Sequence, residues 1–388
     1  MTSRWSILAV LFFARTAMAF QYQSVAALSP QLVESYLLSI ADLGILIGLY
    51  LGPGIFVAIP GGTIAARFGD KRVTMASLGL MLAGAVMITF ASDWNLIAAG
   101  RILAGIGGVV INVIMTKMLV DWFEGREIGT AMGIFICSWP AGIALALLIL
   151  PLLAAGGGLM LADAGVIMII AVAIAALAVI YRPASASVAV AAGAPSRGLP
   201  VTPLVAAGGV WALYNAGCAM VFAFGPLLLT EQGMTAATAG PVISFFMFTL
   251  AVGVPLGGLL ADRTGRTVAI ISASLLSFAF CLLVLPVVPI RLALPAYGVA
   301  GLIAGLAAGP VMTLPSKVLP PPARALGMGV FFTIYYVAMM SAPAIGGYFA
   351  ESAADAGAAY LCGIVMIACA LGSLLLYQRS AVTAQAAA

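Results

Sequence analysis

The stretch PLGGLLADRTGRT, residues 255–267, decides the fold. It ends one apolar run, turns on glycine, carries a basic cluster and leads into the next apolar run. A related stretch, PGGTIAARFGDKRV, occupies residues 60–73. The matching glycines Gly62 and Gly258 are 196 residues apart (258 − 62), close to half of the 388-residue chain. This spacing predicts two homologous halves, each turning on its own copy of the loop.

The composition places the chain in a lipid bilayer. Hydrophobic residues make up 64% of the sequence and charged residues 7%, whereas soluble domains carry about 25% charged residues. Backbone groups in lipid must be hydrogen-bonded internally, so membrane spans are helices or closed barrels. The apolar runs are continuous over about 20 residues, the length of a spanning helix, and lack the alternation of barrel strands. We therefore expect an all-α membrane protein.

Twelve membrane-spanning helices are expected, in two pseudo-symmetric halves of six. The N-terminal half covers residues 1–181, a cytoplasmic linker covers 182–203, and the C-terminal half covers 204–388. The linker is rich in Ala, Ser, Pro and Gly, a composition typical of flexible connections. The expected spans lie at about residues 5–28, 38–66, 73–91, 94–120, 128–153, 159–181, 203–229, 239–261, 267–288, 292–318, 326–350 and 358–377.

Basic residues predict the orientation of these spans. With the N-terminus inside, Arg291 is the one basic residue that falls in an outside loop. Such an excess of inside Lys and Arg is the usual signal for topology, so both termini are expected in the cytoplasm, and the membrane is expected to be a bacterial inner membrane. The residues on or near the inside are Arg4, Arg67, Lys71, Arg72, Arg126, Arg182, Arg197, Arg263, Arg266, Lys317, Arg324 and Arg379.

The pattern Gly-x-x-x-Asp-Arg-x-Gly-Arg at residues 258–266 resembles the signature loop of the major facilitator superfamily, between helices 2 and 3 and between helices 8 and 9. The first copy departs from it, with Ala66 at the acidic position and an aspartate only at Asp70. The resemblance implies a twelve-helix, monomeric carrier that works by alternating access. It also implies that the loops form a conformational latch, made here by Arg67, Asp70, Asp262, Arg263 and Arg266.

Two further stretches resemble particular groups within this superfamily. WFEGREIGTAMG, residues 122–133, together with Arg15, is similar to the cyanate and nitroimidazole porters and to the oxalate–formate exchangers. FQYQSVAAL, residues 20–28, resembles a branch of eukaryotic lysosomal dipeptide carriers.

Arg15 lies near the middle of the first expected span. Charges inside membranes usually face a cavity or a partner. Tyr22 and Gln23 follow at i+7 and i+8 on the same helical face, and arginine binds carboxylates through two parallel hydrogen bonds. We therefore expect these three residues to bind a small anionic substrate. The alternative is a structural arginine that ties the first span to backbone carbonyls or to a neighbouring helix.

Arg101 opens an Arg-x-x-x-Gly element in the fourth span, with Asn112 further along the same face. The element resembles one that many facilitator antiporters use in proton coupling, and both residues are candidates for substrate binding. The alternative is that Arg101, near the outer end of its span, extends to the membrane interface.

Polar residues near the middle of later spans complete the candidate site: Tyr214 and Asn215 in the seventh span and Tyr336 in the eleventh. The family resemblance implies that these spans contribute to a central cavity. The alternative for each is ordinary packing.

Lys117 and Lys317 occupy matching positions near the cytoplasmic ends of the fourth and tenth spans. Either they extend to the interface, as long basic side chains usually do, or they flank the inner mouth and attract an anion.

Several functions are excluded. We find no Walker loop, no dinucleotide-binding fingerprint and no nucleophile arrangement, and the chain has no histidine. An enzyme, a cofactor, a metal site and a nucleic-acid partner are therefore not expected; the expected partners are the bilayer and a small solute. No acidic residue lies in the middle of a span, which favours facilitated transport or exchange over proton coupling. The alternatives are a proton-coupled peptide carrier or drug exporter, and a non-transporting receptor or assembly protein.

Overall fold

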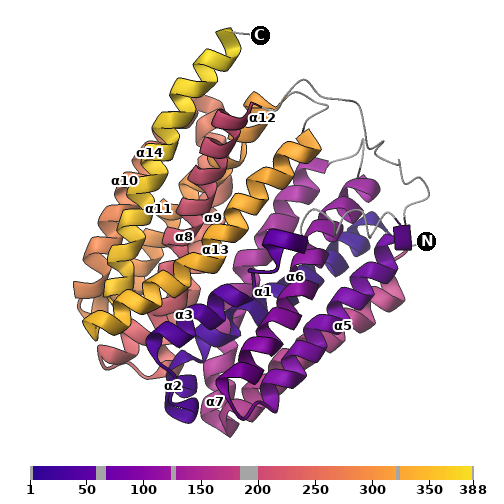
Figure 1. The fold of residues 1–388 in the computed structure, drawn as a ribbon, viewed down its shortest axis with the longest axis vertical. Helices are drawn as coiled ribbons and strands as arrows, with labels where there is room; N and C mark the ends of the chain where they lie inside the picture. The colour runs from indigo at the N-terminus through magenta and orange to yellow at the C-terminus, as the bar shows by residue number, and fades with distance from the viewer. Residues whose placement is uncertain (1–2, 58–66, 124–127, 184–199, 320–323, 387–388) are drawn as a thin grey trace.

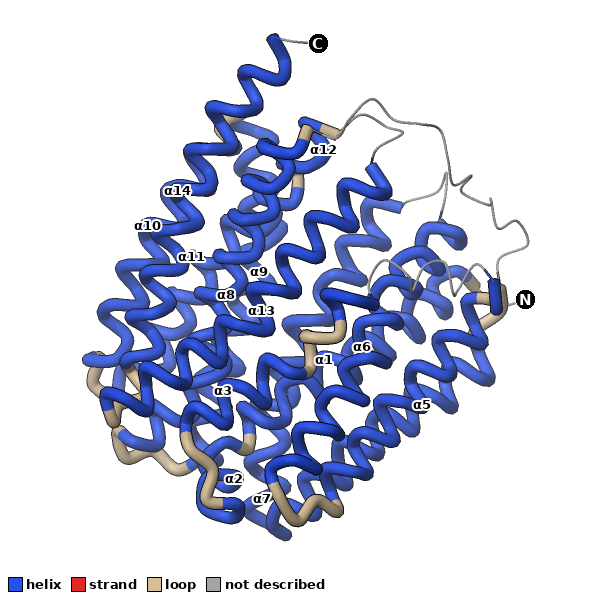
Figure 2. Tube along the Cα trace, viewed as in Figure 1, coloured by secondary structure: helices blue, strands red, loops and turns tan. Residues whose placement is uncertain are grey.

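The computed structural model describes residues 3–57, 67–123, 128–183, 200–319 and 324–386. The regular elements within these ranges are helices, with no strand among them (Figure 2). The α-helices are α1 (Arg4–Ala27), α2 (Ser29–Tyr36), α3 (Ile40–Leu49), α5 (Asp70–Thr89), α6 (Trp94–Phe123), α7 (Ile128–Ile180), α8 (Val201–Glu231), α9 (Ala236–Thr264), α10 (Thr267–Val284), α11 (Ala293–Met312), α12 (Leu314–Val318), α13 (Arg324–Ala353) and α14 (Ala358–Ala386), with short 3-10 turns at Leu285–Val287 and Ile290–Leu292.

The prediction of a twelve-helix membrane protein is confirmed. Eleven helical segments of the described chain are long and apolar enough to cross a membrane. One of them, Ile134–Ile180, has 47 residues; at 1.5 Å per residue it would measure about 70 Å, more than twice the bilayer core. It breaks at Gly157 and Gly158, where Gly158 has φ 71°, a left-handed conformation that favours glycine. Its two parts are the expected fifth and sixth spans.

The helices form two groups, with α1 to α7 on one side of the bundle and α8 to α14 on the other (Figure 1). Packing repeats between the groups, since α5 lies against α6 as α10 lies against α11. Both chain termini lie at the same end of the bundle, which we call the terminal end; the opposite end is the far end (Figure 1).

The two halves meet toward the far end. There α3 packs on α13 and α7 packs on α9. The contact is close because α3 presents Gly44 and Gly48, where a Cβ would collide with the backbone of Pro343 and Met340. Small residues allow such close helix approach in membranes.

Hydrogen bonds join the halves at the same level. The backbone N–H of Ala41 donates to Glu351 Oε2 at 3.0 Å, and the Ser244 hydroxyl donates to the Ala144 carbonyl. These contacts therefore hold the two halves together at the far end of the bundle.

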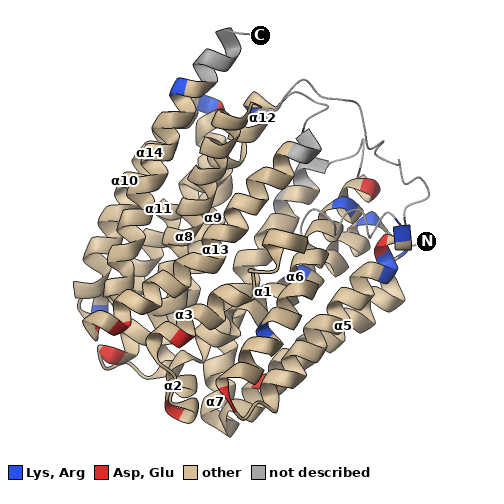
Figure 3. Ribbon diagram, in the orientation of Figure 1, with Lys and Arg blue, Asp and Glu red and all other residues tan. Residues whose placement is uncertain are grey.

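The two loop copies turn alike in the backbone. Gly69 and Gly265, again 196 residues apart (265 − 69), both adopt positive φ, at 88° and 68°. Half of the first copy, residues 60–66 with Ala66 among them, lies outside the described residues. Lys and Arg gather mostly at the terminal end and Asp and Glu mostly at the far end (Figure 3).

Two details differ from the sequence prediction. The segment Ser29–Tyr36, expected to be a loop, is the short helix α2, because Pro30 in its first turn and buried Leu32 favour helix. The second span is not continuous: α3 ends at Leu49, and a turn at Tyr50–Pro53 precedes residues 54–57.

Candidate functional site: a cavity between the halves

A cavity of about 320 Å³ lies between the two halves, at the low end of the range for small-molecule sites. Its walls come from α1, α6 and α7 on one side and from α8, α9, α11 and α13 on the other. Among the described residues that line it, Arg15 is the one with a charge. Seven aromatic residues surround the space: Trp139, Trp211, Tyr214, Phe222, Phe332, Tyr335 and Tyr336.

The side chain of Arg15 reaches from α1 to two neighbouring helices. Its Nε donates to Asn112 Oδ1 on α6 at 2.9 Å, and its Nη1 donates to the Phe135 carbonyl on α7 at 3.0 Å. The guanidinium also lies 4.8 Å from the centre of the Phe135 ring, a favourable cation–π distance. All these partners are neutral, and none of the described residues forms an ion pair with Arg15. A positive charge therefore lies in the cavity wall with no counter-charge among the described residues.

Asn112 connects Arg15 to the opposite half. While its Oδ1 accepts from Arg15, its Nδ2 donates to the hydroxyl of Tyr336 on α13 at 3.3 Å. Three predicted residues from three helices thus form one hydrogen-bonded chain across the cavity. Both partners orient the Asn112 amide, because its oxygen can only accept a hydrogen bond and its nitrogen can only donate one.

Tyr214 and Asn215, on α8, also line the cavity. The hydroxyl of Tyr214 donates to the Ala304 carbonyl at 3.0 Å, and the Asn215 amide donates to the Trp211 carbonyl at 2.8 Å. The structure therefore brings five of the eight predicted substrate residues to one cavity.

Tyr22 and Gln23 do not line it. Tyr22 is fully buried behind two lining rings, with its ring centre 5.2 Å from Trp139 and 6.3 Å from Phe222. Its hydroxyl has no hydrogen-bond partner among the described residues. Gln23 Nε2 donates to the Phe222 carbonyl at 2.6 Å and so joins the halves. Both residues lie about two turns further along α1 than Arg15, beyond the cavity.

Arg101 lies outside the cavity and is fully buried. Its Nε donates to the Leu46 carbonyl at 3.0 Å, and its two Nη atoms donate to the carbonyls of Gln21 and Tyr22, each at 2.9 Å. The guanidinium also lies over the Tyr50 ring at 4.7 Å. Arg101 thus ties α1, α3 and α6 together. The alternative that it extends to the interface is wrong, because these carbonyls hold it inside.

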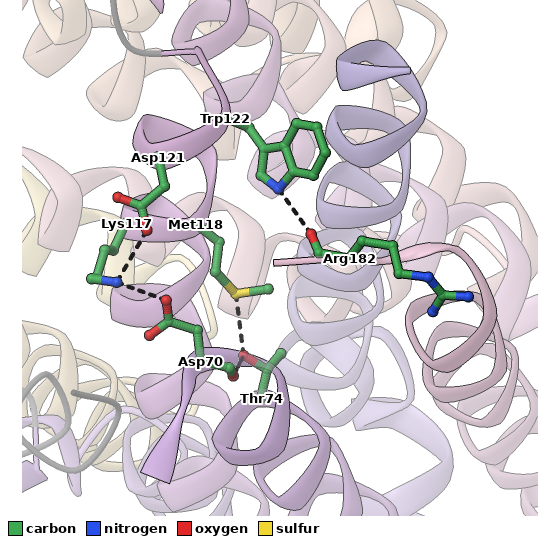
Figure 4. Close-up of polar contacts among 7 residues, drawn as sticks. All are labelled: Asp70, Thr74, Lys117, Met118, Asp121, Trp122 and Arg182. Carbon is green, nitrogen blue, oxygen red and sulfur yellow. Dashed lines mark hydrogen bonds and ion pairs between the residues drawn. The ribbon is translucent and has the colours of Figure 1, made fainter. Parts of the chain in front are cut away.

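Lys117 forms the centre of a charged cluster at the terminal end of the N-terminal half (Figure 4). Its Nζ lies 2.7 Å from Asp70 Oδ2 and 3.1 Å from Asp121 Oδ2. Nearby, Lys71 Nζ donates to the carbonyls of Ala178 and Tyr181 at 2.8 and 3.0 Å. Asp70 therefore pairs with a lysine of its own half.

The matching region of the other half is built differently. Lys317 Nζ donates to Thr267 Oγ1 at 3.3 Å. The expected latch residues Asp262, Arg263 and Arg266 are exposed, as is Arg67, and no ion pair joins them to a described residue.

Sequence reasoning missed Trp211 and Gln21. Trp211 lines the cavity four residues before Asn215, so helical spacing from that predicted residue could have found it. Gln21 donates to the Met81 carbonyl at 2.8 Å and accepts from the Tyr50 hydroxyl at 3.2 Å. The sequence gives no signal for these contacts, because one partner is a backbone carbonyl and the other, Tyr50, is 29 residues away along the chain.

The fold and the cavity define a class: helical membrane carriers with a solute site between two halves. The sequence model of the Major Facilitator Superfamily matches residues 11–225 and again residues 208–387. The chain belongs to the Major Facilitator Superfamily. The prediction of a carrier rather than an enzyme is confirmed by this membership.

Solved structures show the same fold at low sequence identity. A bacterial homologue of the human lysosomal transporter Spinster, in an inward-facing and occupied conformation, superposes with a TM-score of 0.78 at 14% identity, over 97% of this chain and 96% of the other. The nucleoside transporter NupG gives 0.77 at 12% identity, over 97% and 99%.

Curated relatives match over shorter stretches. A lysosomal dipeptide transporter of Danio rerio is 29% identical over 119 residues, which are 30% of this chain and 26% of that protein. The Arabidopsis thaliana protein named "Probable anion transporter 4, chloroplastic" is 29% identical over 119 residues, 30% of this chain and 22% of that protein. The match thus spans about a quarter of these relatives' length.

Proposed function

We propose that this carrier moves a small anion by alternating access, by facilitated transport or exchange. One observation carries the proposal: Arg15 lies in the wall of the cavity between the halves, and its hydrogen-bond partners among the described residues are all neutral. Burying an unpaired charge is costly, and an anionic solute would supply the missing counter-charge. We assign the substrate contacts to Arg15, Asn112, Tyr214, Asn215 and Tyr336.

We assign structural or conformational roles to the remaining predicted residues. Tyr22, Gln23 and Arg101 brace α1 beside the cavity. Lys117, Asp70 and Asp121 stiffen the terminal end of the N-terminal half. The exposed Arg67, Asp262, Arg263, Arg266 and Lys317 are then available for contacts between the halves in another conformation.

The placement in the membrane follows the charges. With Lys and Arg mostly at the terminal end (Figure 3), the positive-inside rule puts both termini in the cytoplasm. Contacts at the far end would then close the cavity to the outside. We further propose a monomer in a bacterial inner membrane, with halves at residues 1–181 and 204–388 joined by the linker 182–203.

Among carriers of this superfamily, the cyanate and nitroimidazole porters and the oxalate–formate exchangers are the groups we favour. The relative named as an anion transporter agrees with the charge of the substrate.

A dipeptide carrier is the second candidate, because a relative is named as a lysosomal dipeptide transporter. Arg15 would suit the carboxylate end of a peptide. The amino end would need a carboxylate, however, and no acidic residue is among the described residues that line the cavity.

The test is anion exchange in liposomes by the purified chain and by its Arg15→Gln variant, with small carboxylates, inorganic anions, dipeptides and cationic drugs as solutes. We expect exchange of one class of anion, lost in the variant. Transport of peptides or cations that the variant retains would refute the proposal. Ligand-induced thermal stabilisation without any transport would indicate a receptor instead.

A further inference from the structure

The cavity pairs a single positive charge with an aromatic wall, and this pairing restricts the kind of anion that fits. The hydrogen bonds of Arg15 to the described residues use its Nε–H and one N–H of Nη1. An arginine has five N–H groups, so three remain, which is enough for one carboxylate. A second carboxylate on the same solute would find no cation among the described lining residues and would be buried unpaired.

The aromatic wall belongs to α8 and α13. The ring centre of Trp211 lies 5.9 Å from that of Tyr214 and 6.3 Å from that of Tyr335. Tyr335 in turn lies 5.2 Å from Tyr336, which connects through Asn112 to Arg15. The rings and the guanidinium are therefore parts of one continuous surface that crosses the cavity.

Apart from Asn215, the rest of the lining is largely apolar and adaptable. It includes four flexible methionine side chains, Met18, Met247, Met312 and Met339. A solute with only a carboxylate would leave this surface uncovered, whereas an aromatic ring would bury apolar area against it and gain from ring–ring contact.

We propose that the solute is a small monoanion with an aromatic body, whose carboxylate binds Arg15 while its ring packs against Trp211 and Tyr335. The inference rests on the proposed function and names the substrate class more narrowly. It excludes dianions and simple inorganic anions as preferred solutes, so the kinship proposed above with the cyanate porters and the oxalate–formate exchangers would not extend to oxalate or cyanate as the solute of this chain.

Binding to the full-length chain in lipid nanodiscs, measured by calorimetry, tests the inference with four probes: phenylacetate, acetate, phenylmalonate and phenylacetamide. We expect phenylacetate to bind at least about tenfold more tightly than acetate, because only it covers the ring wall. The dianion phenylmalonate and the uncharged phenylacetamide should each bind at least about tenfold more weakly than phenylacetate.

Variants separate the ring contact from the charge. Trp211→Leu should weaken phenylacetate about tenfold and leave acetate unchanged, and Trp211→Phe should keep most of the affinity. Trp94→Leu is the matched control. The indole N–H groups of Trp211 and Trp94 are both buried with no partner among the described residues, but the ring of Trp94 does not line the cavity.

The outcomes distinguish the two proposals. If acetate or phenylmalonate binds as tightly as phenylacetate, and Arg15→Gln abolishes binding, the aromatic monoanion is wrong and the anion carrier stands. If no probe binds, or if Arg15→Gln binds phenylacetate as the parent does, both proposals are wrong.

Discussion

Arg101 and Arg15 are two arginines of the N-terminal half that lie within the membrane, and they differ in how far hydrogen bonds satisfy their side chains. Arg101 is fully buried, and each of its three side-chain nitrogens donates to a backbone carbonyl. Arg15 lines the cavity, and among the described residues it donates to one carbonyl and one side-chain amide. A membrane-embedded charge is therefore not in itself a sign of a binding site. What distinguishes Arg15 is the hydrogen-bonding capacity that its neighbours leave unused.

The largest effect should follow Arg101→Met. Three carbonyls would lose their donor, and each buried unsatisfied group costs about 1–3 kcal/mol. We expect the free energy of unfolding, measured by denaturant titration in mixed micelles, to fall by about 3–5 kcal/mol. Arg101→Lys should recover only part of this loss, because one ammonium cannot reach three carbonyls on two helices. A variant as stable as the parent would remove the contrast between the two arginines.

Arg15→Met should do the reverse. It removes an uncompensated charge, which is favourable, but it also takes a donor from Asn112 Oδ1 and from the Phe135 carbonyl. These two effects oppose each other, so the free energy of unfolding should change by less than about 1 kcal/mol. Anion affinity should fall about ten- to a hundredfold, the value of a lost charge-assisted hydrogen bond. Loss of stability as large as that of Arg101→Met would show that Arg15 is structural and that the site lies elsewhere.

Asn112→Ala should have an intermediate effect on binding. Arg15 keeps its charge but loses the acceptor that orients Nε, so anion affinity should fall about three- to tenfold. Tyr336→Phe, which removes the next link, should cost less. In a double-mutant cycle the two losses should not add, because the residues share one hydrogen-bonded chain. Additive losses would mean that they act independently.

The smallest effect is expected from Tyr22→Phe. The hydroxyl has no partner among the described residues, so its removal should leave anion affinity unchanged and raise the free energy of unfolding by up to about 1 kcal/mol. Weaker anion binding in this variant would place Tyr22 at the site after all.

Much of this architecture is readable in the sequence. Hydropathy gives the spans because lipid must face continuous apolar runs, and the glycines of the two loops mark the repeat. Gly157 and Gly158 separate the fifth and sixth spans where the prediction put a boundary. The α2 helix was missed because its residues are too polar to register as a span.

The site was predictable only in part. Arg15, Asn112 and Tyr336 stand out as polar residues in apolar runs, yet their convergence depends on how three helices rotate and pack. The same holds for telling Arg15 from Arg101, since the acceptors of Arg101 are main-chain carbonyls that any residue could carry. Periodicity placed Tyr22 and Gln23 on the face of Arg15 but could not tell how far along α1 the cavity extends.

The contact between the two halves at the far end has a consequence for how the carrier responds to the salt concentration around it. Among the described residues no ion pair joins the halves there; the contacts are the glycine surfaces of α3 against α13 and a few hydrogen bonds to backbone groups. Dissolved salt screens charges but hardly affects such contacts. The rate at which the two halves part at this end should therefore be nearly independent of ionic strength, so any salt dependence of turnover would arise at the charged terminal end or in the capture of the solute.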